Sequence, residues 1–321
     1  PQAQAAREAE GGQEAHEDGR FRRGAAGGLH RRAQPGRVGG EEEVSKPGYV
    51  PGATSGQPSE GAGEHPQVGP RPLARTRSFT RRGGRMPERH HRALSDNGEQ
   101  YVLDVPRKPG TTEPVDGFRL DIAEVFGRRA KLVVEIGSGA GDQIVHAALE
   151  HPETDFIALE VWRPGIAQTI SKAVHAGVTN VRLIEIDASE ALDRLFAPGS
   201  VDEVWTFFPD PWPKTKHHKR RLVQLGFADV VADVLVPGGT WRLATDWADY
   251  AWHMRDVAEA SPRFTNPWTG RLADAGDAHV DPEGARGGFA PRFEGRTTTR
   301  FETKGLKVER IVRDLEVKRA N

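Results

Sequence analysis

From about residue 116 onward, apolar residues gather into short runs that alternate with amphipathic stretches. The runs predict β-strands over residues 131–136, 155–159, 181–186, 201–208 and 240–244. The stretches between them repeat apolar residues at the helical period of about 3.6 residues. Because strand–helix repeats of roughly 25 residues build βαβ units, the pattern predicts an α/β fold with a mostly parallel central sheet and helices on both faces.

Each predicted helix carries one apolar face that fits against such a sheet. The faces consist of Ile144, Val145, Ala148 and Leu149 in the first helix, of Ile166, Ile170, Ala173 and Val174 in the second, of Ala191, Leu192, Leu195 and Phe196 in the third, and of Leu222, Leu225, Ala228, Ala232 and Leu235 in the fourth. Ligands of parallel sheets bind at the carboxyl ends of the strands. The residues that end the strands are therefore the first candidates for chemistry.

The first 115 residues differ from the domain predicted at 116–321. Residues 1–70 contain one leucine, Leu29, and no isoleucine or methionine, which predicts a disordered low-complexity tail. Residues 71–115 form a basic arm, in which Glu88 is the only acid among the closely spaced arginines of 71–92. Two interpretations of this arm remain open: a solvated linker, or a segment that contacts nucleic-acid phosphates.

Composition excludes several classes of function. The chain has no cysteine, so it has neither disulfides nor thiolate chemistry, and a reducing compartment such as the cytoplasm is the expected location. It also has no run of about 18 apolar residues, so no membrane span is expected. His217 and His218 are adjacent, but no other histidine has ligand spacing with them, so no metal site is predicted.

A glycine turn and acids at strand ends predict a site for an adenosine-containing cofactor. The first strand ends in Glu-Ile-Gly-Ser-Gly-Ala-Gly at 135–141, where Gly137 and Gly139 allow a tight turn and a close approach of backbone to ligand. Glu160 ends the second strand and is expected to bind ribose hydroxyls, and Asp187 after the third strand is expected near an adenine edge. NAD and S-adenosylmethionine both contain adenosine, but the third glycine of the GxGxxG dinucleotide motif is missing.

The fourth strand leads into Phe-Pro-Asp-Pro-Trp-Pro at residues 208–213. Prolines fix the backbone and remove donors, so this is a rigid loop that presents one carboxylate, Asp210, between aromatic side chains. Aromatic faces stack on bases, and a carboxylate accepts hydrogen bonds from base N–H groups. The basic run that follows predicts phosphate binding beside the loop; it contains Lys214, Lys216, His217, His218, Lys219, Arg220 and Arg221.

Two further polar groups belong to the candidate site. Asp246 follows the fifth predicted strand and therefore lies at the same edge of the sheet. The sequence Thr-Thr-Thr-Arg-Phe-Glu at residues 297–302 precedes a final β-like run. From the residues alone, this last segment fits a structural role as well as a functional one.

Together and in this order, the motifs resemble the bacterial tRNA (guanine-N7-)-methyltransferase family over about residues 77–321. The resemblance rests on EIGSGAG at 135–141, LE at 159–160, FPDPWPK at 208–214, KHHKRR at 216–221, ATDW at 244–247 and TRFE at 299–302. It implies a Rossmann-like class I methyltransferase that uses S-adenosyl-L-methionine to methylate N7 of a guanine in the variable loop of tRNA. It also implies tRNA as the partner, no metal, and either a monomer or a homodimer.

Residue roles follow from the resemblance, motif by motif. The expected cofactor contacts are Glu135, Gly137, Gly139, Glu160, Asp187 and Asp210, and the expected catalytic residue is Asp210. The expected substrate contacts are Lys214, Lys216, His217, His218, Lys219, Arg220, Arg221, Asp246, Thr299, Arg300, Phe301 and Glu302. Arg300 stands where the family commonly has lysine, which keeps the charge but changes the donor geometry.

Three alternatives remain beside this interpretation. A methyltransferase acting on another base atom, such as an exocyclic nitrogen, would carry an Asp/Asn-Pro-Pro-aromatic loop, whereas here the acid lies between prolines. An NAD-dependent oxidoreductase would need the missing third glycine and a hydride-transfer site. A noncatalytic RNA-binding scaffold of the same fold would have no need of the acids Glu135, Glu160, Asp187 and Asp210.

Overall fold

The structure is a computed structural model and describes residues 86–269, 271, 287–298, 302–303 and 310–321. The predicted tail at 1–70 and the first part of the basic arm, up to residue 85, lie outside these residues. So do three of the expected substrate contacts, Thr299, Arg300 and Phe301.

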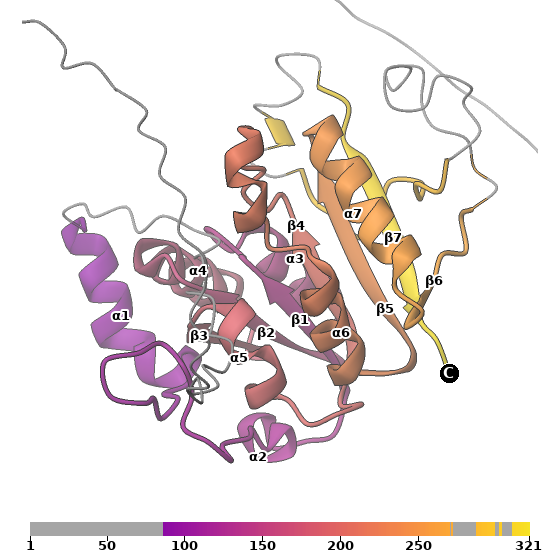
Figure 1. The fold of residues 1–321 in the computed structure, drawn as a ribbon. Helices are drawn as coiled ribbons and strands as arrows, with labels where there is room; N and C mark the ends of the chain where they lie inside the picture. Colours follow the sequence, from indigo (N-terminus) through magenta and orange to yellow (C-terminus); the bar gives the residue numbers. More distant parts are fainter. Residues whose placement is uncertain (1–85, 270, 272–286, 299–301, 304–309) are drawn as a thin grey trace, which may run out of the picture. The chain divides into compact units, whose positions relative to one another are not determined.

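Seven strands form one sheet in the order β3-β2-β1-β4-β5-β7-β6 (Figure 1). The parallel strands are β1 (Lys131–Ile136), β2 (Thr154–Glu160), β3 (Val181–Glu185), β4 (Val201–Phe207) and β5 (Leu235–Thr245). Strand β7 (Arg313–Arg319) runs antiparallel to β5 and to the short β6 (Phe264–Thr265). The strand order reverses between β1 and β4, and such a switch point is where open α/β sheets bind ligands. This confirms the predicted Rossmann-like fold.

Helices cover both faces of the sheet (Figure 1). One face carries α1 (Glu88–Tyr101), α3 (Asp142–Glu150) and α4 (Arg163–Ala176). The other carries α5 (Ala188–Leu195), α6 (Leu225–Val234) and α7 (Ala248–Ala260), with the short α2 (Ile122–Phe126) packed on the same core. The two cores alternate along β1, since Leu132 and Val134 face the α5–α7 side and Val133 faces the α1–α4 side. This alternation follows from the period of two residues in a strand.

The structure corrects some of the predicted boundaries. Strand β4 ends at Phe207, one residue before the prediction, because Phe208 has a left-handed backbone with φ 50°. Leu235 was expected on the apolar face of a helix, but it begins β5. Leu149, Val174 and Leu225 were also expected on apolar faces, but they are 53%, 44% and 51% exposed. The buried faces of these helices are therefore narrower than the sequence pattern suggests.

Candidate active site

Three glycines in the left-handed conformation shape the turn after β1. They are Gly137 (φ 75°), Gly139 (φ 58°) and Gly141 (φ 76°), and only glycine adopts this backbone without strain. The N–H of Gly137 donates to the carbonyl oxygen of Leu159 at 2.8 Å, and the N–H of Gly139 donates to Glu160 Oε2 at 2.7 Å. The turn is thus tied to the carboxyl end of β2.

Two glycines allow α4 and the glycine turn after β1 to pack without side chains between them. A Cβ on Gly141 would lie 2.3 Å from Thr169 Oγ1, and a Cβ on Gly165 would lie 2.2 Å from the carbonyl oxygen of Gly139. Both distances are far inside van der Waals contact. The first turn of α4 therefore packs directly against the glycine turn, which fixes the surface that a cofactor would meet.

Glu160 joins the glycine turn to the start of α4. Its Oε1 accepts hydrogen bonds from the N–H groups of Val161 and Trp162 at 2.7 and 2.8 Å, and its Oε2 accepts the bond from Gly139. Burial raises the pKa of Glu160, and these three backbone N–H groups oppose that rise. A carboxylate has about four acceptor sites, so capacity remains on Oε2 for a ligand hydroxyl. This position fits the predicted ribose contact.

Glu135 is a buried acid beside the same turn. Its side chain is only slightly exposed, at 3%, and Oε2 has no hydrogen-bond partner among the described residues. Burial, followed by the charges of Glu160 and Asp142, raises the pKa of Glu135 to about 8. An acid held in this way favours a cationic ligand group, because a nearby positive charge stabilises the carboxylate.

Asp187 is the residue directly before α5. Its Oδ1 accepts hydrogen bonds from the N–H of Ser189 at 3.0 Å and from the Ser189 hydroxyl at 2.8 Å. An aspartate in this position caps a helix, which contributes about 1 kcal/mol to stability. Asp187 therefore has a structural task in addition to the adenine contact predicted for it.

The loop at residues 208–213 is strained at two bulky residues. Phe208 has φ 50° and Trp212 has φ 45°, values at which side chains larger than glycine cost about 1–3 kcal/mol each. The N–H of Phe208 donates to the carbonyl oxygen of Ala244 at 2.7 Å, which ties the loop to β5. Such strain concentrates at functional sites, where neighbouring structure holds it in place.

Asp210 stands exposed between these two strained residues. Burial is the main cause of the raised pKa values of Glu160 and Tyr250, and the negative charge of Asp210 adds to both. Asp210 therefore lies on the side of Glu160 and of Tyr250 on α7, at the carboxyl edge of the sheet. The structure thus brings together residues from β1, β2 and the loop after β4, as predicted from their places at strand ends.

The basic run divides into exposed and buried members. Residues Thr215–Arg220 form a short 3-10 helix, η1, so the run precedes α6 and is not part of its first turn. Lys214, Lys216 and Lys219 are exposed, whereas the guanidinium-bearing side chain of Arg221 is only 1% exposed. Arg220 stacks over the ring of Trp212 with its guanidinium carbon 4.9 Å from the ring centre. Arg221, expected to face RNA with the others, is instead buried.

Comparison with known proteins relates the chain to methyltransferases. A family model described as "Putative methyltransferase" matches residues 129–278. The chain is 43% identical over 269 residues to the tRNA (guanine-N(7)-)-methyltransferase of Paenarthrobacter aurescens, with 74% of this chain and 89% of the relative covered. The corresponding enzyme of Cutibacterium acnes is 46% identical over 244 residues, with 76% and 83% covered. That of Bifidobacterium longum subsp. infantis is 40% identical over 264 residues, with 79% and 92% covered.

The chain belongs to the tRNA (guanine-N(7)-)-methyltransferase family. This confirms the family inferred from the sequence motifs and makes the protein a methyltransferase. Its cofactor is S-adenosyl-L-methionine, which carries an adenosine, an ammonium group and a sulfonium group. The buried Glu135 carboxyl, the glycine turn and the acceptor capacity of Glu160 fit these groups.

Two further motif residues of this methyltransferase, Asp246 and Glu302, take part in ion pairs. Asp246 Oδ2 lies 3.0 Å from the guanidinium of Arg310, which also stacks over the ring of Trp247 at 5.1 Å. Glu302 is 4% exposed, and its carboxylate lies 2.8 Å from a guanidinium nitrogen of Arg296. Substrate contacts by Asp246 and Glu302 remain predictions, since both carboxylates already face arginines of the same chain.

Two residues of the site were missed in the sequence. Gln143 in the first turn of α3 donates to the carbonyl oxygen of Gly295 at 2.9 Å and accepts from the N–H of Thr297 at 2.8 Å. Arg296 is fully buried and stacks over the ring of Phe208 at 5.4 Å. Neither belongs to a motif, and the partners of Gln143 and the ring on which Arg296 stacks lie far away in the sequence. Only their closeness to the glycine turn and to the TRFE motif is visible from the sequence.

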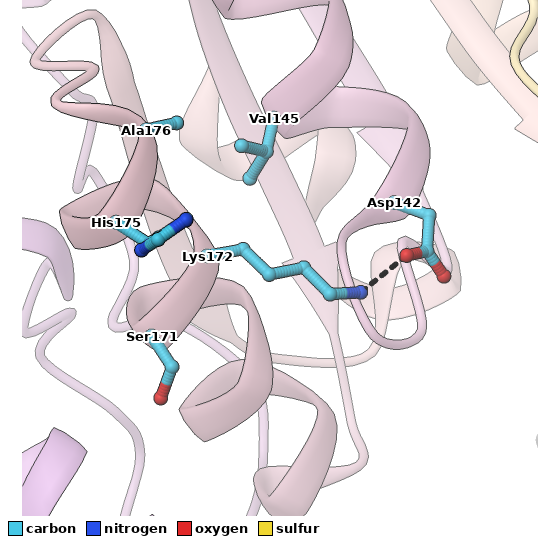
Figure 2. A pocket seen from close by; sticks show the side chains of 6 residues that line it. All are labelled: Asp142, Val145, Ser171, Lys172, His175 and Ala176. Carbon is cyan, nitrogen blue, oxygen red and sulfur yellow. Dashed lines mark hydrogen bonds and ion pairs between the residues drawn. The ribbon is translucent and has the colours of Figure 1, made fainter. Parts of the chain in front are cut away.

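An open hollow of about 550 Å³ is lined by residues of α3 and α4 (Figure 2). Lys172 reaches across it, forms an ion pair with Asp142, and donates to the carbonyl oxygen of Ala140 at 2.7 Å. Val145 and Ala176 contribute apolar surface (Figure 2). Lys172 thus ties α4 to the glycine turn and to the start of α3.

Within the described ranges, no group of three or more histidine, aspartate or glutamate side chains is arranged to hold a metal ion. None of the helices in these ranges has the length and apolar character needed to cross a membrane.

Proposed function

We propose that this protein transfers the methyl group of S-adenosyl-L-methionine to N7 of a guanine in the variable loop of tRNA, and that it does so in the cytoplasm. The observation that carries the proposal is the strained loop that presents the exposed Asp210 at the carboxyl end of β4, in a chain 43% identical to a tRNA (guanine-N(7)-)-methyltransferase. The ring faces of Phe208 and Trp212 next to Asp210 suit a base, because aromatic side chains stack on unpaired bases.

The chemistry needs little beyond alignment. Guanine N7 has a free lone pair and no proton, so no general base is required before the step. The lone pair forms a bond to the methyl carbon while the bond from that carbon to sulfur breaks, and the sulfur keeps the electron pair. Positive charge thereby moves from the sulfur to the guanine ring. The protein must hold guanine N7, the methyl carbon and the sulfur in line, and such positioning lowers the activation barrier of the transfer.

Asp210 is the residue proposed to act on the base. A fixed carboxylate stabilises the positive charge that develops on the ring and accepts hydrogen bonds from the N–H groups of the base edge. Asp210 is exposed, so it is accessible to a base that enters the loop. Glu135 and Glu160 lie deeper, at the glycine turn, and are proposed to hold the cofactor rather than the base.

The exposed lysines next to the loop are proposed to meet the tRNA backbone. Lys214, Lys216 and Lys219 project from η1 and the residue before it, between four and nine positions after Asp210. Lysines neutralise phosphates, and this interaction dominates the affinity for nucleic acids. The proposal therefore separates base recognition by the loop from backbone binding by the basic run.

Product analysis tests the proposal. Purified protein is incubated with unmodified tRNA and methyl-labelled S-adenosylmethionine, the RNA is digested to nucleosides, and the labelled nucleoside is identified. The proposal predicts 7-methylguanosine. Another labelled nucleoside would favour the alternative in which a different base atom is methylated, and the absence of any label would favour a noncatalytic RNA-binding role.

A further inference from the structure

We propose that Arg221 and Arg296 are positioning residues that hold the loop at residues 208–213 on either side of Asp210, so that Asp210 is presented to the guanine base. The inference rests on the proposed function, because it assigns the loop a role in turnover. It differs from the role expected for the basic run, in which Arg221 would contact RNA.

Arg221 holds the second half of the loop through a hydrogen bond to its backbone. Its Nε donates to the carbonyl oxygen of Pro211 at 3.0 Å, directly after Asp210. Its guanidinium also forms an ion pair with Asp249 on α7 and stacks over the ring of Tyr250 at 4.9 Å. A guanidinium nitrogen lies 3.0 Å from His218 Nε2. One buried side chain thus connects the loop to α7 and to η1.

Arg296 holds the first half of the loop. It is fully buried and donates through two nitrogens to Asp314 on β7, at 3.1 and 2.8 Å, while a third nitrogen lies 2.8 Å from Glu302. With its charge compensated in this way, the guanidinium stacks on Phe208, the residue with φ 50°. A paired fork is a rigid platform, because two parallel hydrogen bonds fix its orientation.

The loop needs support from other elements because its three prolines limit the hydrogen bonds that it forms within itself. Pro209, Pro211 and Pro213 have no backbone N–H and therefore form no donor bonds within the loop. Phe208 and Trp212 both have an unfavourable backbone conformation. Strained residues persist only where surrounding structure fixes them. The two buried arginines contact the loop at Pro211 and at Phe208, one on each side of Asp210.

The burial of these arginines separates them from the phosphate-binding lysines. Arg221 is 1% exposed and Arg296 is 0% exposed, so neither guanidinium reaches solvent in this structure. Lys219, two residues before Arg221, is exposed. Two functions therefore lie side by side in the basic run. Its lysines face outward toward the substrate, and its last arginine faces inward to hold the loop.

Conservative variants test the inference. Arg221→Lys and Arg296→Lys keep the positive charge but lose the fork that bonds two partners at once. We expect kcat at saturating tRNA to fall about 100-fold, as for a small misplacement of a catalytic group. We expect the Kd values for tRNA and for S-adenosylmethionine to change by less than about threefold, a shift well below one tenfold step of affinity.

A matched control separates positioning from general stability. Arg255 is another buried arginine, on α7 itself, and it bonds Glu259 and the carbonyl oxygen of Gly287 rather than Pro211 or Phe208. Arg255→Lys is expected to lower the melting temperature while kcat stays as in the wild type. Asp249→Asn is a milder variant, since Asp249 is 55% exposed, and it is expected to lower kcat in a protein that remains folded.

The outcomes are distinct. The inference is supported if both lysine variants lose kcat at unchanged tRNA affinity and Arg255→Lys does not. It is overturned if Arg221→Lys raises the Kd for tRNA while kcat at saturation is unchanged, which would make Arg221 an RNA contact. Equal loss of kcat in Arg255→Lys would also overturn it. If the wild type forms no 7-methylguanosine, the proposed function itself fails, whatever the variants do.

Discussion

Gly165 lies so close to Gly139 that a Cβ on Gly165 would be only 2.2 Å from the carbonyl oxygen of Gly139. The glycine turn that follows β1 and the first turn of α4 are therefore in direct backbone contact. Glu160 strengthens this contact, since its carboxylate accepts hydrogen bonds from Gly139 and from the residue before α4, Trp162. The shape of the cofactor surface depends on this junction.

Gly165→Ala is expected to displace the glycine turn. The added methyl group would lie 2.2 Å from the Gly139 carbonyl oxygen and 2.6 Å from the Trp162 ring, so overpacking is expected to destabilise the protein by about 1–3 kcal/mol. The affinity for S-adenosylmethionine is expected to fall at least about tenfold, which corresponds to roughly 1.4 kcal/mol. Titration calorimetry and thermal unfolding measure the two effects.

Gly226→Ala is the matched control for that variant. Gly226 also lies in the first turn of a helix, α6, but a Cβ on it would meet no atom within 4 Å. Alanine has the higher helix propensity, so this change is expected to stabilise the protein by about 0.5–1 kcal/mol and leave cofactor affinity intact. Equal effects of the two substitutions would contradict the close packing at Gly165.

The buried Glu135 carboxyl predicts a pH dependence of stability in the free protein. Its pKa in the folded protein is about 8, against 4.5 for the exposed group, because of burial and then of the charges of Glu160 and Asp142. Between these values the folded state binds a proton that the unfolded state releases. Stability is therefore expected to fall as pH rises from about 5 to 8, by up to about 1.4 kcal/mol per pH unit, and then to level off.

Urea unfolding at several pH values tests this prediction. Glu135→Gln cannot ionise, so its unfolding midpoint is expected to vary less with pH than that of the wild type across the same window. S-adenosylmethionine is expected to flatten the wild-type profile as well, because its positive charges stabilise the carboxylate. A Glu135→Gln profile parallel to the wild type would show that Glu135 is ionised in the folded protein.

The exposed lysines predict a salt-dependent part of tRNA binding. The double change Lys216→Gln with Lys219→Gln is expected to reduce the slope of log Kd against log salt by about 0.7–0.9 for each phosphate that is no longer neutralised. A control with the same change in charge is Lys131→Gln with Lys318→Gln. Lys131 begins β1, and Lys318 bonds Thr240 near the opposite end of the sheet from the strand-end acids. An identical change of slope in both pairs would mean that binding responds to net charge alone.

Asp210→Asn tests the role proposed for the loop carboxylate. The amide keeps the size of the side chain but removes the charge that would stabilise the methylated ring. Turnover is expected to fall about 100- to 1000-fold, as when one group that stabilises a transition state is removed, while the Kd for S-adenosylmethionine changes less than about tenfold. Single-turnover rates and calorimetry supply the two values. Equal decreases would make Asp210 a cofactor ligand only.

The parallel part of the fold was predictable because each strand is recognisable locally. Strand β1 has the bounds predicted from its apolar run, and Glu135 and Glu160 come together because parallel strands end at one edge. A final β-like run was expected after residue 302 and is present as β7, but its antiparallel position between β5 and β6 was not predicted. Its pairing joins residues such as Arg242 and Glu316, 74 positions apart, and no local pattern encodes such a distance.

The gathering of strand-end acids at one edge of the sheet was predictable, but the contacts of individual side chains were not. In the sequence, a run of cations indicates one charged surface. Arg221 is nevertheless buried, because its side chain pairs with Asp249 on α7, and that residue lies 28 positions later in the chain. Arg296 gave no signal, since its role depends on Asp314 and on the ring of Phe208. The positive φ of Phe208 and Trp212 was likewise invisible, because it arises from tertiary contacts that override the preference of bulky residues.

Transfer of the methyl group to guanine N7 is the central claim, and replacing that atom tests it most directly. Two tRNA transcripts are compared with the wild-type protein and labelled S-adenosylmethionine, one with ordinary guanosine and one with 7-deazaguanosine, which has a C–H group in place of N7. We predict label in the ordinary transcript and none in the substituted one, although the substituted transcript still competes for binding. Equal label in both transcripts would contradict the claim, because the methyl group would then reside on another atom.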